Sequence, residues 1–111
     1  MKGTDRYRVE GVTCRVGEQA LNVVNMSVSG FFVESADPPP VASSLEVQLT
    51  LPGEEPMSIV GTLVWINATQ SPRHATLPPG FGFRMQRIPF AAKMAVLKYL
   101  RGTHPSALRD R

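Results

Sequence analysis

The stretch Asn25-Met26-Ser27-Val28-Ser29-Gly30-Phe31-Phe32-Val33-Glu34 decides how this chain is interpreted. Its first half has the pattern Asn-x-Ser-x-x-Gly, and apolar residues typical of strands lie on both sides of it. Asn and Ser side chains bond to nearby backbone and hold turned or bulged conformations. Glycine supplies either a positive φ or room for a close approach to the backbone. The stretch therefore predicts a bend between two strands, which fits an ordinary bulged hairpin as well as a binding site.

Short strands are predicted wherever apolar and polar residues alternate. They cover residues 9–16, 21–24, 31–34, 45–51, 57–66 and 81–85. Gly61 in the middle of a long strand indicates the sharp coiling that a small closed barrel requires. After Pro89, four apolar residues recur at helical spacing, namely Phe90, Met94, Leu97 and Leu100. They predict one C-terminal helix that begins near Pro89 and is capped at Gly102.

The expected fold class is mainly β, a six-stranded antiparallel β-barrel with one C-terminal α-helix. Residues 1–8 are expected to form a flexible basic arm, residues 9–101 the barrel and helix, and residues 102–111 a disordered tail. The four apolar helix residues are expected to pack against the barrel, with Lys93 and Lys98 in solvent. The alternating positions predict an inward-facing set, which consists of Val12, Cys14, Val47, Leu49, Ile59, Leu63, Phe81 and Phe83.

Composition limits the class of protein. A chain of 111 residues suits one domain with a modest core. No apolar run approaches the roughly 20 residues of a membrane helix, and the first residues lead into no signal-peptide core. A single cysteine excludes an internal disulfide and fits a reducing cytoplasm. The net charge of +3 suits an anionic ligand or partner.

The sequence offers little chemistry for catalysis. His74 and His104 lie in proline-flanked polar segments, which argues against a histidine metal site. Cys14 occupies an inward strand position and is better interpreted as a small core residue than as a nucleophile. Gly80-Phe81-Gly82 precedes a strand instead of a helix, so it is not a phosphate-binding loop. We therefore expect no enzyme, no metal and no bound cofactor, and a binding or adaptor module remains.

The order of these features resembles a PilZ domain from about Arg6 to Leu100. The Asn-x-Ser-x-x-Gly pattern follows the second strand, as in that family. Val60-Gly61-Thr62-Leu63-Val64-Trp65 resembles its penultimate strand, with a glycine and a terminal tryptophan. Gly80-Phe81-Gly82-Phe83-Arg84-Met85 resembles its Gly-x-Gly-Val-x-Phe last strand, and the helix after Pro89 matches its C-terminal helix.

This resemblance implies a function. PilZ domains are known as receptors for the bacterial second messenger cyclic di-GMP. The family binds it with an Arg-x-x-x-Arg motif in the N-terminal arm and an Asp/Asn-x-Ser-x-x-Gly motif on the barrel. The second motif is intact here as Asn25, Ser27 and Gly30. By resemblance, Asn25 and Ser27 would hydrogen-bond one side of the ligand, and Gly30 would let it approach.

The arginine motif departs from the family pattern. With Arg6 as its second member the first becomes Lys2, and with Arg8 as its second member the first becomes Thr4. The Arg6 alignment is preferred, because Arg6-Tyr7 followed by Gly11-Val12-Thr13-Cys14 resembles PilZ members with a short first strand. The expected ligand-binding residues are Lys2, Arg6, Arg8, Asn25, Ser27 and Gly30. A lysine supplies a point charge on a flexible stem and lacks the planar fork of arginine.

Several alternatives stay open. Some members that resemble PilZ domains lack the arginine motif and act as protein-interaction adaptors in pilus or motility systems. The first interpretation is thus a cytoplasmic module that binds cyclic di-GMP and relays the state to an unknown partner protein. The second is an adaptor without nucleotide affinity, and the helix face could also form a homodimer. Nucleic-acid binding is disfavoured, because Tyr7, Phe31 and Phe32 are too few and too clustered for a stacking platform.

Overall fold

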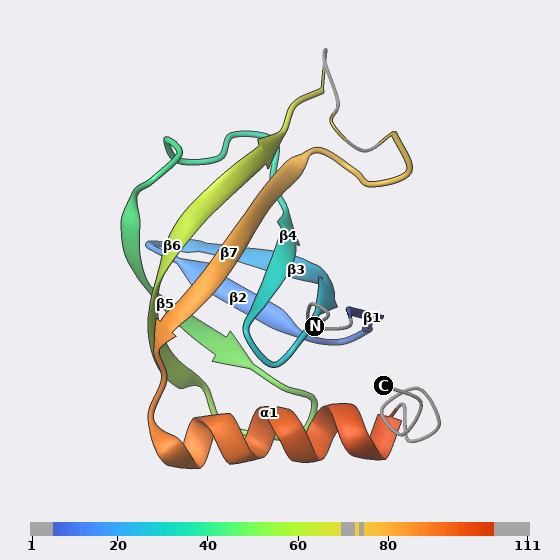
Figure 1. Cartoon of the computed structure of the whole chain (residues 1–111), viewed down its shortest axis with the longest axis vertical. Coiled ribbons are helices and arrows are strands. Elements are labelled where there is room, and N and C mark those ends of the chain that lie inside the picture. Colours follow the sequence, from blue (N-terminus) through green and yellow to red (C-terminus); the bar gives the residue numbers. More distant parts are fainter. Residues whose placement is uncertain (1–5, 70–72, 74, 104–111) are drawn as a thin grey trace, which may run out of the picture.

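The computed structural model describes residues 6–69, 73 and 75–103. This part of the chain contains seven strands and one helix (Figure 1). In chain order they are β1 (Tyr7–Arg8), β2 (Thr13–Val16), β3 (Gln19–Met26), β4 (Gly30–Glu34), β5 (Ser44–Thr50), β6 (Met57–Asn67), β7 (Gly80–Arg87) and α1 (Phe90–Thr103).

The strands form a closed antiparallel barrel. Hydrogen-bonded neighbours follow the order β1-β3-β2-β5-β6-β7-β4, and a further pairing of β3 with β4 closes the ring of six. This confirms the expected fold class. The short strand β1 lies outside the ring and pairs with β3 through Tyr7 opposite Met26 and Arg8 opposite Asn25. Tyr7 and Arg8 are therefore part of the sheet, and their assignment to a flexible arm was wrong.

The barrel interior holds the predicted core. All eight residues predicted to face inward are fully buried. At the centre, the rings of Phe31 and Phe83 contact each other with centroids 5.1 Å apart. β6 changes register against β7 between Val60 and Gly61, and a Cβ on Gly61 would overlap the Arg84 carbonyl oxygen. Gly61 therefore gives β7 the room to approach β6 closely at a register shift.

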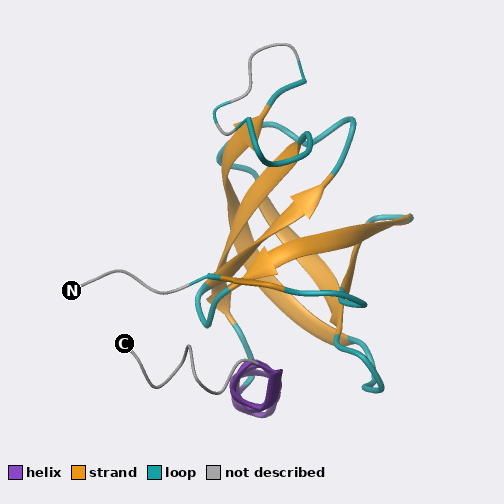
Figure 2. Cartoon of the chain, turned by 90° about the vertical axis from the view of Figure 1, so that its right-hand side faces the viewer, coloured by secondary structure: helices purple, strands orange, loops and turns teal. Residues whose placement is uncertain are grey.

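The helix α1 lies across one end of the barrel (Figures 1 and 2). Its buried residues are Ala92, Val96 and Leu100, whereas Phe90 is 77% exposed and Met94 is 46% exposed. The prediction that Phe90 and Met94 pack on the barrel was therefore wrong. Apolar residues occupy more than one stripe of this helix, so their spacing alone did not determine which stripe faces inward.

The C-terminal end of α1 differs from the predicted end of the helix. Lys93 and Lys98 are exposed, as expected. Gly102 lies inside the helix, which continues to Thr103, so the predicted cap at Gly102 was wrong. The disordered tail was expected to begin at residue 102, but residues 102 and 103 are helical, and the rest of that tail, residues 104–111, lies outside the described residues. Among the described residues, α1 is the only helix, and it is not long and apolar enough to cross a membrane.

Candidate functional site

The turn between β3 and β4 is held by its own polar groups. The Ser27 amide donates to the Gly30 carbonyl at 2.8 Å. The Ser27 hydroxyl accepts a hydrogen bond from the Ser29 amide at 3.2 Å and lies 3.4 Å from the Gly30 carbonyl oxygen. Ser27 is only 1% exposed. Its side chain therefore shapes the turn that follows Asn25.

Gly30 is required by the neighbouring strand. It is paired with Arg84 of β7, and a Cβ on residue 30 would overlap the carbonyl oxygen of Phe83. Its backbone does not adopt a positive φ. Of the two roles that the sequence allowed for this glycine, the structure shows the close approach, and the approaching group is β7.

Four neighbouring strands contribute to one row of residues on the outer face of the barrel. Asn25 of β3 is opposite Phe32 of β4, Phe32 is opposite Gly82 of β7, and Gly82 is opposite Trp65 of β6. Gly82 has no side chain, so the Trp65 indole lies over it. The indole reaches Phe32 and stacks on it with centroids 5.2 Å apart and an interplanar angle of 29°. Phe32 is consequently buried although it lies outside the core cluster.

Two β-bulges put this row on the outer face. The β3–β4 register shifts between Val23 and Asn25, and the β6–β7 register shifts between Leu63 and Trp65. Val23 and Leu63 are core residues, and strict alternation would turn Asn25 and Trp65 inward beside them. An extra residue in each strand re-aims the next side chain to the opposite face. The bulges therefore bring a polar amide and an aromatic ring to one surface.

Arginines lie beside the Asn25 end of the row. Arg6 Nη1 donates a hydrogen bond to Asn25 Oδ1 at 3.2 Å, and Arg8 is directly opposite Asn25 across β1 and β3. Desolvation by burial lowers the pKa of the Arg6 guanidinium, although an arginine remains protonated at neutral pH. The structure thus brings Arg6, Arg8 and Asn25 together, and Lys2 lies outside the described residues.

A hollow of about 440 Å³ opens along this row. Its lining residues are Arg6, Asn25, Phe32, Trp65, Arg73, Thr76 and Leu77. The Arg73 guanidinium lies over the Trp65 ring, 5.2 Å from the centroid. Phe32, Trp65 and Arg73 were not among the site residues predicted from the sequence. The tryptophan near the end of β6 was a signal, but the bulge that aims it outward was not visible in the sequence.

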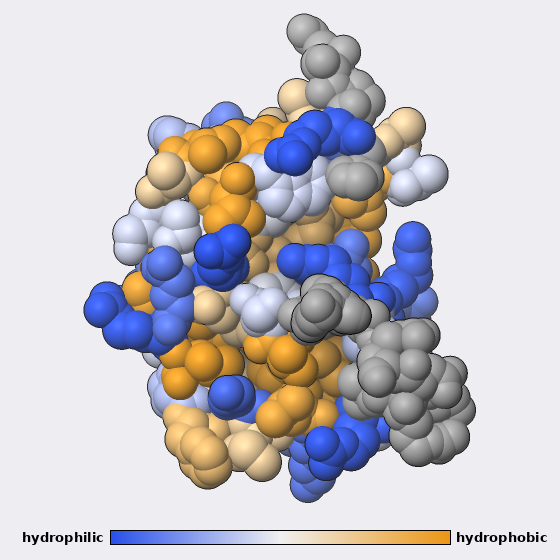
Figure 3. Space-filling model, in the orientation of Figure 1, coloured by the Kyte–Doolittle hydropathy of each residue, from blue (hydrophilic) through white to orange (hydrophobic). Residues whose placement is uncertain are grey.

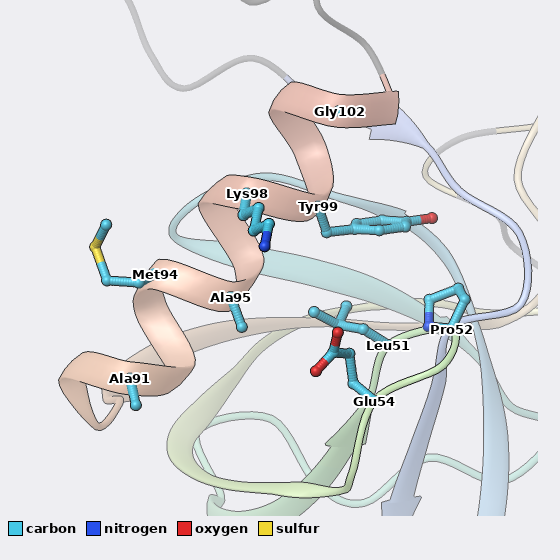
Figure 4. A pocket seen from close by; sticks show the side chains of 9 residues that line it. All are labelled: Leu51, Pro52, Glu54, Ala91, Met94, Ala95, Lys98, Tyr99 and Gly102. Atoms are coloured by element: carbon cyan, nitrogen blue, oxygen red, sulfur yellow. The ribbon is translucent and has the colours of Figure 1, made fainter.

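A second hollow, of about 470 Å³, lies between α1 and the turn after β5 (Figure 4). Tyr99 reaches from the helix toward Pro52, and Met94 points away from that turn. The space-filling view shows several apolar patches at the helix end of the molecule, and hydrophilic residues separate these patches (Figure 3). One cation, Lys98, and one carboxylate, Glu54, line this hollow.

The described residues contain no group of three or more side chains able to hold a metal ion.

A closed six-stranded barrel with a helix across one end defines a class of small β-barrel domains. Within that class the chain belongs to the PilZ domain family, whose sequence model matches residues 6–102. No curated protein matches the chain in sequence.

Four chains of solved structures match this one, among them one from Bacillus subtilis and one from Escherichia coli. The Bacillus subtilis inhibitor of motility MotI/DgrA has a TM-score of 0.71 at 19% identity, covering 96% of this chain and 53% of that chain. YcgR from Escherichia coli in complex with c-di-GMP has a TM-score of 0.65 at 11% identity, covering 99% of this chain and 50% of that chain. At these identities the similarity shows the fold alone. This chain spans about half the length of either neighbour.

Proposed function

We propose that this chain is a cytoplasmic PilZ-type module that binds cyclic di-GMP and relays its presence to a partner protein. The observation that carries the proposal is the hydrogen bond of 3.2 Å from Arg6 Nη1 to Asn25 Oδ1. It joins the arginine-bearing segment to the Asn-x-Ser-x-x-Gly turn, the two parts that PilZ domains use for this ligand. Family membership supports the same ligand, as does the neighbour YcgR, which was solved in complex with c-di-GMP.

Each residue would contribute its ordinary chemistry. Arg6 and Arg8 offer fork-shaped donors to the ligand phosphates or to a guanine edge. Asn25 offers an amide that can donate or accept. We assign Ser27 and Gly30 to the shape of the turn, because their hydroxyl and backbone groups already bond within it. Lys2 adds a further positive charge. The proposed activity is binding without catalysis.

Calorimetric titration with cyclic di-GMP tests this function. We expect measurable heat for the wild type, and binding weakened in Asn25→Ala. A matched control is Asn22→Ala, because Asn22 is an exposed residue of the same strand and does not line the hollow. Its affinity should equal that of the wild type. A wild type that shows no heat up to millimolar ligand would overturn the proposal.

One observation favours a second candidate function. Phe90 and Met94 expose apolar side chains on α1, where a monomer would gain by burying them. This is expected of an adaptor that acts through protein contacts in pilus, motility or related regulation. An adaptor without nucleotide affinity gives a flat titration with cyclic di-GMP, whereas the receptor does not, so the same measurement separates the two functions.

A further inference from the structure

Arg73 is an arginine beside the proposed site that belongs to neither motif. It lies in the connection between β6 and β7, far in sequence from Arg6 and Asn25, yet it lines the same hollow. It is exposed. Its contact among the described residues is the one with the Trp65 ring, 5.2 Å from guanidinium carbon to ring centroid.

The Trp65 ring that Arg73 contacts is held in place by its own neighbours. Trp65 stacks on Phe32 and lies over Gly82, so the indole is packed against two neighbouring strands. A guanidinium is attracted to an aromatic face and stacks flat on it. Stacking leaves its N–H donors in the guanidinium plane, and these donors can form two parallel bonds with a planar group. A fork held on a rigid ring loses less entropy on binding than a free side chain.

We propose that Arg73 is a third ligand-binding arginine of this site and pairs with the O6 and N7 acceptors of a guanine base. This inference rests on the proposed function, because the base is one of the two guanines of cyclic di-GMP. Arginine is the side chain that best fits these two acceptors in a bidentate pair. Arg73 thereby supplies, at the Trp65 end of the row, the fork donor that Lys2 cannot supply.

Three variants test the role of Arg73. Arg73→Ala removes charge and fork, and Arg73→Lys keeps the charge alone. Arg101→Ala is the matched control, because Arg101 is also exposed and lies in the last turn of α1, at the end of the molecule away from the β6–β7 connection (Figure 1). Cyclic di-GMP is titrated into each by calorimetry. The chain has one tryptophan, so emission from Trp65 gives a second, independent binding curve.

We expect Arg73→Ala to bind about 10- to 100-fold more weakly than the wild type, Arg73→Lys to stay close to Arg73→Ala, and Arg101→Ala to match the wild type. Wild-type affinity in Arg73→Ala would overturn the inference and leave the proposed function standing. Full recovery in Arg73→Lys would show that charge suffices and would also overturn the assignment to a base edge. A wild type that binds no cyclic di-GMP would overturn the proposed function together with this inference.

Discussion

The indole of Trp65 lies so close over Gly82 that a methyl group on residue 82 would overlap its Nε1. This contact lets one side chain of β6 cross above β7 and stack on Phe32 of β4. Because Gly82 has no side chain, Trp65 and Phe32 can form the aromatic wall of the hollow beside Asn25.

Gly82→Ala should therefore displace the indole. We expect a loss of about 1–3 kcal/mol in the free energy of unfolding, the usual cost of forcing extra volume into a packed site. The emission of Trp65 should shift to longer wavelength as the ring gains contact with water. The control is Gly102→Ala in α1, where an added Cβ meets no atom within 4 Å. A Gly82→Ala variant with wild-type emission and melting temperature would contradict this account.

Two phenylalanines give a matched pair for the core. Phe83 is fully buried against Phe31, whereas Phe90 is 77% exposed on α1. Phe83→Ala should cost about 3–5 kcal/mol, enough to unfold much of a marginal domain. Phe90→Ala should change stability by about 0.5 kcal/mol or less. Chemical denaturation of both variants checks the pair, and equal losses would refute the burial described here.

Cys14 predicts a dependence of stability on pH. Burial raises the pKa of its thiol from 9.0 to about 12. Between these values the unfolded chain loses the proton and the folded chain keeps it. The free energy of unfolding should therefore fall as pH rises from about 9 toward 12, by up to about 1.4 kcal/mol per pH unit.

The stabilisation from the neutral thiol is fully present below pH 9. Other groups also titrate in this range, so the measurement is the difference between wild type and Cys14→Ala in denaturant unfolding at several pH values. The two proteins should converge as pH rises. Parallel curves would contradict a thiol with a raised pKa.

The barrel could be predicted from sequence because its strands alternate cleanly. Most residues predicted to face inward lie in regular stretches, such as Val47 and Leu49 of β5, and all eight are buried. Alternation is a direct consequence of strand geometry, so it determines the inner face wherever the register is unbroken. The face of the helix that packs on the barrel was harder to predict. Ala92 and Val96 face the barrel while Phe90 does not, because packing against the barrel selects among several apolar stripes.

The site was predictable only in part. Arg6, Arg8 and Asn25 could be selected from their motifs, and the structure brings them together. Trp65 and Arg73 could not. A bulge aims Trp65 outward, and the approach of Arg73 depends on the path of a long connection. One inserted residue reverses every later side chain in a strand, and a single sequence does not show where the insertion occurs.

The arginines and the amide beside the hollow should each contribute to affinity. Arg6→Ala, Arg8→Ala and Asn25→Ala remove charged or polar contacts to a dianionic ligand, each worth about 1.5–3 kcal/mol. This corresponds to one to two decades in the dissociation constant for cyclic di-GMP. Raising the salt concentration should also weaken binding, because the exposed charges are screened. Affinity that is independent of salt and of all three substitutions would place the ligand elsewhere.

Restoring the arginine at the start of the family motif is the sharpest comparison of the two candidate functions. Lys2→Arg replaces a point charge by a planar fork that can pair with a phosphate or a guanine edge and can stack on the base. We expect tighter binding of cyclic di-GMP than in the wild type, measured by calorimetry at fixed salt. Lys98→Arg, the same substitution at an exposed residue of α1, should leave the affinity unchanged. Flat titrations for both wild type and Lys2→Arg would overturn the receptor and favour the adaptor.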